Sequence, residues 1–199
     1  MRATLLLGSF CLFSVVACGG GDKPAATSAS PAPSSTTANQ GDPSLAKPAD
    51  HPDSDKVTWK KDLPGKACRT ATAKVGADLG ASLATMAPGC IDAKKMHRVG
   101  TTNNGTGQDV AGKMVTTIPL LAQANHCYRV IGLAEPTITD LDIAVTDSAG
   151  KSAGEDLNDS NDAIVLEDAS ICFKVDDAAN VNVAVARGTG KWAVEVWSD

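Results

Sequence analysis

The strongest constraint on the fold is a set of short segments in which apolar and polar residues alternate. Between residues 141 and 145, Leu, Ile and Val alternate with Asp and Ala, and the same spacing recurs at 171–175, 181–185 and 192–196. A period of two residues is typical of strands that bury one face and expose the other. These segments therefore predict a sheet in the last third of the chain.

Further strand-like segments precede and interrupt this pattern. Residues 113–121, 127–133 and 164–166 are rich in β-branched and other apolar side chains. Turn-forming residues stand at 147–150 and at 187–190, where we expect the chain to reverse direction. Six or seven short strands separated by turns predict a mainly β fold, an antiparallel β-sandwich of the jelly-roll type.

One short helix is expected before the strands. Val75, Leu79, Leu83 and Met86 have helical spacing, and the Pro-Gly pair at 88–89 is a stop signal. The fold class is therefore a sandwich with a single N-terminal helix.

The beginning of the chain has the pattern of an export signal. Arg2 precedes an apolar stretch over residues 5–17, which is shorter than the roughly 20 residues that a membrane span needs. The stretch ends in Val-Val-Ala immediately before Cys18. These residues resemble the lipobox of bacterial lipoproteins. The resemblance implies that residues 1–17 are a signal peptide and that Cys18 carries acyl chains that anchor the protein to a membrane.

Two residues near Cys18, Val15 and Gly19, refine this expectation. Val15 stands where the commonest lipobox has Leu, and the alternative is a plain secreted protein with a chance cysteine. Gly19 stands where an inner-membrane retention signal commonly has Asp. The resemblance therefore implies a lipid-anchored protein of the bacterial cell envelope, at the outer membrane.

The segment that follows the cysteine has the composition of a linker. From residue 19 to residue 56 the only large apolar residue is Leu45, and six of the ten prolines of the chain lie there. Such a segment buries too little apolar surface to offset its ordering entropy. We therefore expect a lipidated, disordered tether over 18–56 and a single folded domain over 57–199.

Four cysteines remain in the expected domain. An even number in an exported domain favours disulfides over a metal site. Cys127 and Cys172 both open strand-like segments, so we prefer this pair, which leaves Cys68 with Cys90. A long helix would keep the second pair apart, so either the helix is short, beginning near Gly76, or the pairing is different.

The C-terminal region also resembles a known family, the pre-peptidase C-terminal-like domain, a small β-sandwich of secreted bacterial proteins. The residues that carry the resemblance lie at 127–130, 140–151, 172–173, 181–186 and 190–197. The last strands of that family commonly carry a tyrosine where this chain has Ala184 or Val185. The resemblance implies a sandwich in an extracellular setting. It implies no activity, because the family has no common catalytic site.

Charge is divided unevenly along the expected domain. Residues 57–136 carry ten Lys and Arg against five Asp and Glu, whereas residues 137–199 carry four against thirteen. Solvated faces are the ordinary explanation. The acidic half, the few aromatic residues and the lack of a basic stripe all argue against nucleic-acid binding.

A weak calcium-loop pattern lies in the acidic half. Oxygen-bearing side chains have the required spacing at Asp156, Asn158, Ser160, Asp162 and Glu167. Asn161 stands where the sharp turn prefers glycine, and strand-like residues follow. The alternative is a hairpin loop whose polar side chains bond to local backbone. No other cofactor is expected.

No catalytic motif is recognisable, and we expect a protein that is not an enzyme. The histidines at 51, 97 and 126 lack a motif partner, and Asp140 with Asp142 fits the solvent-facing side of a strand. We expect a non-catalytic interaction or structural module whose partners are the membrane and an envelope protein or polysaccharide. A carbohydrate-binding module is the alternative, with Trp197, expected to face outward, and Trp59 as the stacking rings.

Overall fold

The computed structural model describes residues 51–61, 68, 75–109 and 115–199, which all belong to one compact unit spanning residues 46–199. The signal peptide, Cys18 and residues 18–50 of the expected tether lie outside the described residues. The described part contains nine strands and the helix α2 (Leu79–Cys90). The strands are β1 (Val57–Lys61), β2 (His97–Gln108), β3 (Val115–Ala122), β4 (Cys127–Ala134), β5 (Ile138–Thr146), β6 (Ser152–Glu155), β7 (Asp162–Ile164), β8 (Ala169–Phe173) and β9 (Asp177–Ser198).

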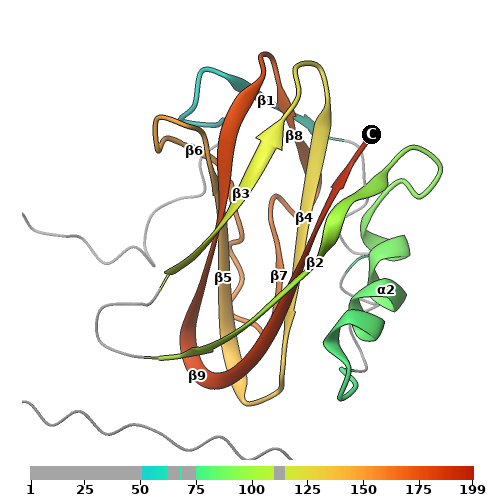
Figure 1. The fold of residues 1–199 in the computed structure, drawn as a ribbon, viewed down its shortest axis with the longest axis vertical. Coiled ribbons are helices and arrows are strands. Elements are labelled where there is room, and N and C mark those ends of the chain that lie inside the picture. The colour runs from blue at the N-terminus through green and yellow to red at the C-terminus, as the bar shows by residue number, and fades with distance from the viewer. Residues whose placement is uncertain (1–50, 62–67, 69–74, 110–114) are drawn as a thin grey trace, which may run out of the picture. The chain divides into compact units, whose positions relative to one another are not determined.

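The strands form two antiparallel layers (Figure 1). In the first layer, β1, β8, β4, the second half of β9 and β2 are neighbours in that order, and β7 lies on the free part of β4. In the second layer the order is β6, β5, the first half of β9 and β3. The predicted antiparallel sandwich is therefore confirmed, with more strands than the alternating segments alone indicate.

Strand β9 belongs to both layers, and this corrects the turn expected at 187–190. The strand continues through these residues and bends, so that its first half pairs with β3 and β5 and its second half pairs with β2 and β4. Gly188 has φ of +102°, and a Cβ atom there would collide with the carbonyl oxygen of Thr137. The glycine therefore makes a corner between the layers where the sequence pattern suggests a hairpin.

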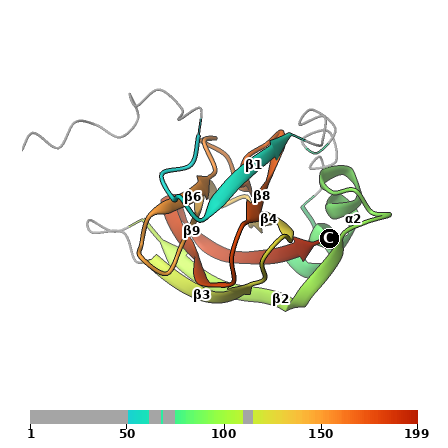
Figure 2. The same cartoon turned by 90° about the horizontal axis from the view of Figure 1, so that it is seen from above.

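The opposite side of the sandwich is closed by the residues around β1. The backbone N–H of Ser54 donates to the carbonyl oxygen of Ser152 at 3.0 Å, and the indole N–H of Trp59 donates to that of Ala153 at 2.6 Å. These bonds join the edge strands β1 and β6, which lie side by side in Figure 2. The sheet is thus nearly closed into a barrel, and we name this junction the seam.

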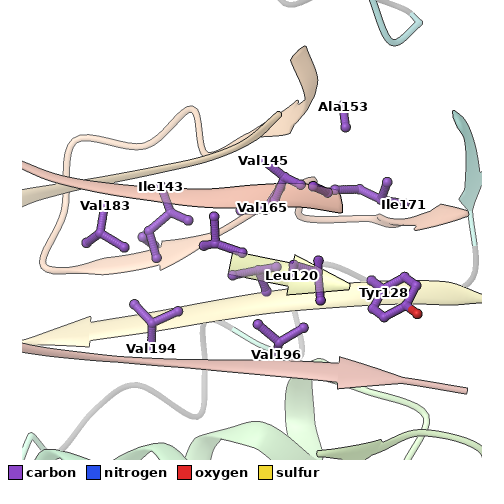
Figure 3. Close-up of a cluster of buried hydrophobic side chains, with 14 of the residues drawn as sticks. Leu120, Tyr128, Ile143, Val145, Ala153, Val165, Ile171, Val183, Val194 and Val196 are labelled. Atoms are coloured by element: carbon purple, nitrogen blue, oxygen red, sulfur yellow. The ribbon is translucent and has the colours of Figure 1, made fainter. Parts of the chain in front are cut away.

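The core lies between the two layers. Alternate residues of the period-two segments point inward, and Figure 3 shows Val145, Val183, Val194 and Val196 among them together with Leu120. Each fully buried side chain of this size stabilises the fold by about 1.5–3 kcal/mol relative to exposure. For β5, β8 and β9 the alternation therefore correctly predicted which side chains point into the core between the layers, apart from Val175, which lies beyond the end of β8 and is 48% exposed.

Strand β5 departs from this alternation near its beginning. The pairing register between β5 and β9 shifts on either side of Asp140. Asp140 and the neighbouring Leu141 are both buried, and only 6% of the Asp140 surface is exposed. Asp142 is half-buried. The expectation that both carboxylates lie on a solvent-facing side is wrong for Asp140, because the bulge turns its side chain inward.

Helix α2 covers the outer side of the first layer. Asp78 caps its first turn by accepting the N–H of Ala81 at 3.1 Å, and Leu83 and Met86 pack against Ile131. The helix runs to Cys90, so the Pro-Gly pair at 88–89 lies in its last turn and does not end it. Since the helix begins only at Leu79, it is short, as one of the two sequence-based alternatives required.

Candidate functional site

The four domain cysteines are joined in two disulfides. Cys127 pairs with Cys172 across β4 and β8, where the two residues stand opposite each other with Cα atoms 3.9 Å apart. Cys68 pairs with Cys90 at the end of α2, with Cα atoms 4.3 Å apart. The preferred pairing is therefore confirmed, and no thiol of the domain is left for a metal or a nucleophile.

The two tryptophans expected to bind sugar lie on opposite faces of one layer. Trp59 stands opposite Ile171 of β8, whose side chain belongs to the core between the layers. Trp197 stands opposite Arg129 and packs against the cluster beneath α2. Side chains that point to opposite faces of a sheet cannot form one platform.

The packing of the half-buried Trp197 against the cluster beneath α2 also corrects the expectation that this side of β9 faces solvent. Glu195, on the same side of the strand, is only 1% exposed, because α2 covers this face. One of its carboxylate oxygens accepts from the Arg98 guanidinium at 3.0 Å and from the Thr102 hydroxyl at 2.8 Å. Glu195 therefore ties β9 to β2.

The predicted calcium-loop residues are engaged locally. The Asp156 carboxylate accepts from the amide of Asn158 at 3.1 Å and from the backbone N–H of Ile164 at 3.3 Å. The Ser160 hydroxyl donates to the carbonyl oxygen of Asp162 at 2.8 Å. Within the described ranges, no three His, Cys, Asp or Glu side chains are grouped to hold a metal. The backbone carbonyl of the fifth candidate, Glu167, accepts from Arg129.

Arg129 is a buried cation that sequence reasoning did not single out. Its guanidinium donates to the carbonyl oxygens of Cys90, Leu166, Glu167 and Ala169, and its residue is 1% exposed. These carbonyls belong to the end of α2, to the connection between β7 and β8, and to the first residue of β8. Arg129 therefore joins the helix to the sheet, since one planar group bonds to several carbonyls at once.

The histidines make main-chain contacts. Nδ1 of His126 lies 2.7 Å from the carbonyl oxygen of Asp199, and Nδ1 of His51 lies 3.3 Å from that of Pro52. His97 is exposed at the start of β2. His126 thus connects the start of β4 to Asp199, whose carboxylate oxygen lies 3.7 Å from the same Nδ1, whereas His51 contacts its sequence neighbour.

A groove of about 550 Å³ lies between the start of α2 and strands β2 and β9. Asp78, Asn104 and Lys191 line it together with Trp192. Trp192 is only 3% exposed, because its ring packs against the backbone at Gly105, where a Cβ atom would collide with it. The groove therefore offers no exposed aromatic face to a sugar.

The seam also includes charged contacts from Ser54 and Lys56, just before β1, to Asp147 after β5 and to Asp177 at the start of β9. The Ser54 hydroxyl donates to Asp147 at 2.7 Å, and the Lys56 ammonium donates to Asp177 at 2.6 Å. Asp177 also accepts the backbone N–H of Ser148 at 2.8 Å. Residues 54 and 56 lie within the expected tether, so the domain begins several residues before residue 57.

The seam carboxylates have perturbed acidities. Burial acts to raise the pKa of Asp147, but hydrogen bonds from Ser54 and from the N–H groups of Lys151 and Ala149 outweigh it, so the pKa lies below its ordinary value. Burial likewise acts to raise the pKa of Asp177, and bonds from Lys56 and Ser148 lower it overall. Both groups are thus held as carboxylates.

A second surface, on one side of β3, β9 and β5, is not covered by the described helix. Strand alternation places one side of β3, β9 and β5 outward, and we name this side the open face. Its residues are Val115, Thr117, Pro119, Leu121, Asp142, Ala144, Thr146, Ala178, Asn180, Asn182 and Ala184. The helix α2 lies beside β4 and β2, away from β3 and β5 (Figures 1 and 2). The open face is therefore uncovered by the described helix.

No protein-family model matches the chain, and the comparison with curated proteins finds no relative. Among the described residues, none of the helical structure is both long and apolar enough to cross a membrane.

Proposed function

We propose that this chain is a lipid-anchored protein of the bacterial cell envelope, with Cys18 as the lipidated residue and the sandwich as a non-catalytic interaction module. The observation that carries the proposal is the pairing of all four domain cysteines in disulfides. Disulfides persist in oxidising compartments outside the cytoplasm. This supports export, and Cys18 is the one cysteine of the expected mature chain that these two disulfides do not use.

Four of the described ionisable groups have structural partners within the fold. Asp147 and Asp177 serve the seam, Glu195 joins β9 to β2, and Arg129 joins α2 to the sheet. Each of these groups connects two segments of the fold. These contacts hold the fold together, and we therefore propose that the interaction takes place on the surface of the sandwich.

Metabolic labelling with a palmitate analogue tests the anchor. We expect the parent chain to incorporate the label and to sediment with membranes, and Cys18→Ser to lose both. Cys11→Ser is the matched control, because Cys11 lies within the expected signal peptide and its substitution keeps Cys18. Labelling that survives Cys18→Ser would refute the assignment.

Membrane fractionation tests the outer-membrane location. The expectation rests on Gly19, which follows the lipidated cysteine. We expect the parent chain in the outer-membrane fraction and Gly19→Asp in the inner-membrane fraction. If the two chains fractionate together, the residue after Cys18 does not decide the location.

Calcium binding by residues 156–167 stays a secondary prediction. Isothermal titration of the full chain with Ca²⁺ checks it, and Asp156→Asn is the variant to compare. Heat of binding that Asp156→Asn removes would support the loop as a site, and no heat from the parent chain would refute it.

A further inference from the structure

We propose that the end of the sandwich at which the tether enters lies on the membrane, with Leu121 and Val175 inserted among zwitterionic phospholipids. The proposal rests on the lipid anchoring proposed above and names the partner of the interaction module. We name this end the tethered end, and its residues are 51–56, 121–126, 147–151 and 174–178.

The tethered end is where three turns of the sheet meet the first described residues of the chain. The N–H of Lys174, in the turn between β8 and β9, donates to the carbonyl oxygen of Lys56 at 2.8 Å. The N–H of Ala124, between β3 and β4, donates to Asp176 at 2.7 Å, and the seam bonds of Asp177 hold the turn between β5 and β6. These segments lie together at the upper end of the sandwich in Figure 1. The tethered end is therefore a preformed surface, which loses little conformational entropy on contact.

Two large apolar side chains project from the tethered end. Leu121 is 79% exposed and Val175 is 48% exposed, and they are two of the four large hydrophobic residues that stand exposed in the described part of the chain. Leu121 stands opposite Ala178 of β9, which follows Val175 by three residues, so the Cα atoms of Leu121 and Val175 lie within roughly 16 Å of each other. Val175 occupies a turn, where polar residues, glycine and proline are usual. Exposed apolar side chains this close together mark a contact surface.

The position of the tether selects the membrane as the partner. The expected tether joins the domain at residue 51, four residues before Asp55, whose carbonyl oxygen accepts from the Lys174 ammonium at 2.9 Å. A flexible linker of this length spans roughly 30 Å and holds its two ends at an effective concentration on the order of millimolar. The bend of β9 at Gly188 lies at the opposite end of the sandwich, roughly 35 Å along the strand from Asp177. The tethered end is therefore the part of the described domain that the anchor brings closest to lipid.

The charge of the tethered end favours zwitterionic over anionic lipid. Its segments contain three lysines and five aspartates, a net charge of −2. Two of the lysines already face aspartates, since Lys56 lies 2.6 Å from Asp177 and Lys151 lies 3.9 Å from Asp55. A surface without an excess of cations gains no attraction from anionic headgroups, so the contact depends on the apolar side chains.

Spin labelling of the lipidated full chain in phosphatidylcholine vesicles tests the proposal. Ala178→Cys places a nitroxide beside Leu121 and keeps both apolar side chains, and Val115→Cys is the matched control at the other end of β3. Acylation blocks Cys18 and the disulfides engage the four domain cysteines, so the introduced cysteine is the one that reacts. A polar nickel complex is excluded from the bilayer. We therefore expect it to relax the label at residue 178 severalfold less than the label at residue 115.

Charged substitutions supply the second arm of the test. Leu121→Glu together with Val175→Glu, in the Ala178→Cys background, should remove the protection, because carboxylates are costly to place in lipid. Both positions are exposed, so the fold tolerates the change. Val115→Glu in the same background is the control and should leave the protection unchanged. Equal nickel access at the two labels, protection that survives the double substitution, or protection that requires phosphatidylglycerol would overturn the contact.

Two further readouts separate a membrane from a second copy, and the contact from the anchor. Spectral broadening between nitroxides at residue 178 would place a second copy at the tethered end and overturn the proposal. Flotation with the vesicles reports the anchor. A chain that floats with an unprotected label refutes only the contact, whereas a chain that does not float refutes the anchor and the contact that depends on it.

Discussion

At the scale of single residues, two carboxylates and a lysine hold the seam. Asp147 is 1% exposed and receives a hydroxyl and two backbone N–H groups, and Asp177 receives the ammonium of Lys56. A buried carboxylate that accepts this many hydrogen bonds stabilises the fold only while it is ionised. The seam therefore links the acidity of the medium to the closure of the sandwich.

The seam predicts a loss of stability in acid. The pKa values of Asp147 and Asp177 are lowered in the folded chain, so both groups stabilise the fold above the unfolded value of 3.8, and this contribution is lost as the pH falls through the folded values. We expect the free energy of unfolding in urea to decrease between about pH 5 and pH 2. The double variant Asp147→Asn, Asp177→Asn should show a smaller decrease.

A control separates the seam from general effects of acid. Asp159 is exposed and lies in the loop after β6, so Asp159→Asn is the matched substitution away from the seam. Its unfolding profile should follow that of the parent chain. A double seam variant that also follows the parent chain would contradict the prediction.

At the scale of elements, the bend in β9 depends on one glycine. Gly188→Ala meets two obstacles, a positive φ of +102° and the carbonyl oxygen of Thr137. Gly150 has φ of +79° in an exposed turn, with nothing within 4 Å of an added Cβ atom. We expect Gly150→Ala to cost about 1 kcal/mol of unfolding free energy and Gly188→Ala clearly more than about 3 kcal/mol. Equal costs in urea unfolding would show that the corner does not need glycine.

The disulfide at the end of α2 gives a second prediction at this scale. The bond between Cys68 and Cys90 closes a loop of 22 residues, and its removal by substituting both cysteines with alanine should cost about 3 kcal/mol. Hydrogen exchange should rise first in α2. Removal of the bond between Cys127 and Cys172 is the comparison, and it should raise exchange in β4 and β8. The same exchange pattern in both variants would contradict this assignment.

The sequence predicts those strands in which apolar residues recur at every second position. Strands β5, β8 and both halves of β9 carry an apolar residue at every second position, so their strand character and their inward faces follow from the pattern. Strand β2 reads HRVGTTNNGTGQ and is mostly exposed. Its strand structure comes from pairing with β9 and not from its own side chains, so it was not predicted.

The candidate site was less predictable, because its contacts join distant parts of the chain. The pairing of Ser54 with Asp147 spans 93 residues, and nothing near Ser54 in the sequence indicates it. Trp197 was expected to face outward because alternation does not show that a helix covers that side. The open face is a property of three strands together. By contrast, the disulfides could be predicted from the sequence, since four cysteines allow few pairings.

At the scale of the whole molecule, β9 makes the two layers one cooperative unit. Its first half is a central strand of one layer and its second half is a central strand of the other. Neither layer can lose β9 without losing its middle, so the layers should unfold together. Far-ultraviolet circular dichroism and tryptophan fluorescence should therefore give the same urea midpoint. Separate midpoints would show that one layer survives without the other.

The seam also determines how the domain responds to a mechanical force. Any pull that reaches the domain along the chain from its N-terminal side arrives at residues 51–53 and acts first on the bonds of Ser54 and Lys56, which precede the paired residues of β1. These bonds connect to Ser152 of β6, to Asp147 and to Asp177 at the start of β9, so the load passes to these segments before it reaches the ladder between β1 and β8. The bonds that close the barrel therefore also resist the unfolding of the domain from β1 when force is applied from its N-terminal side.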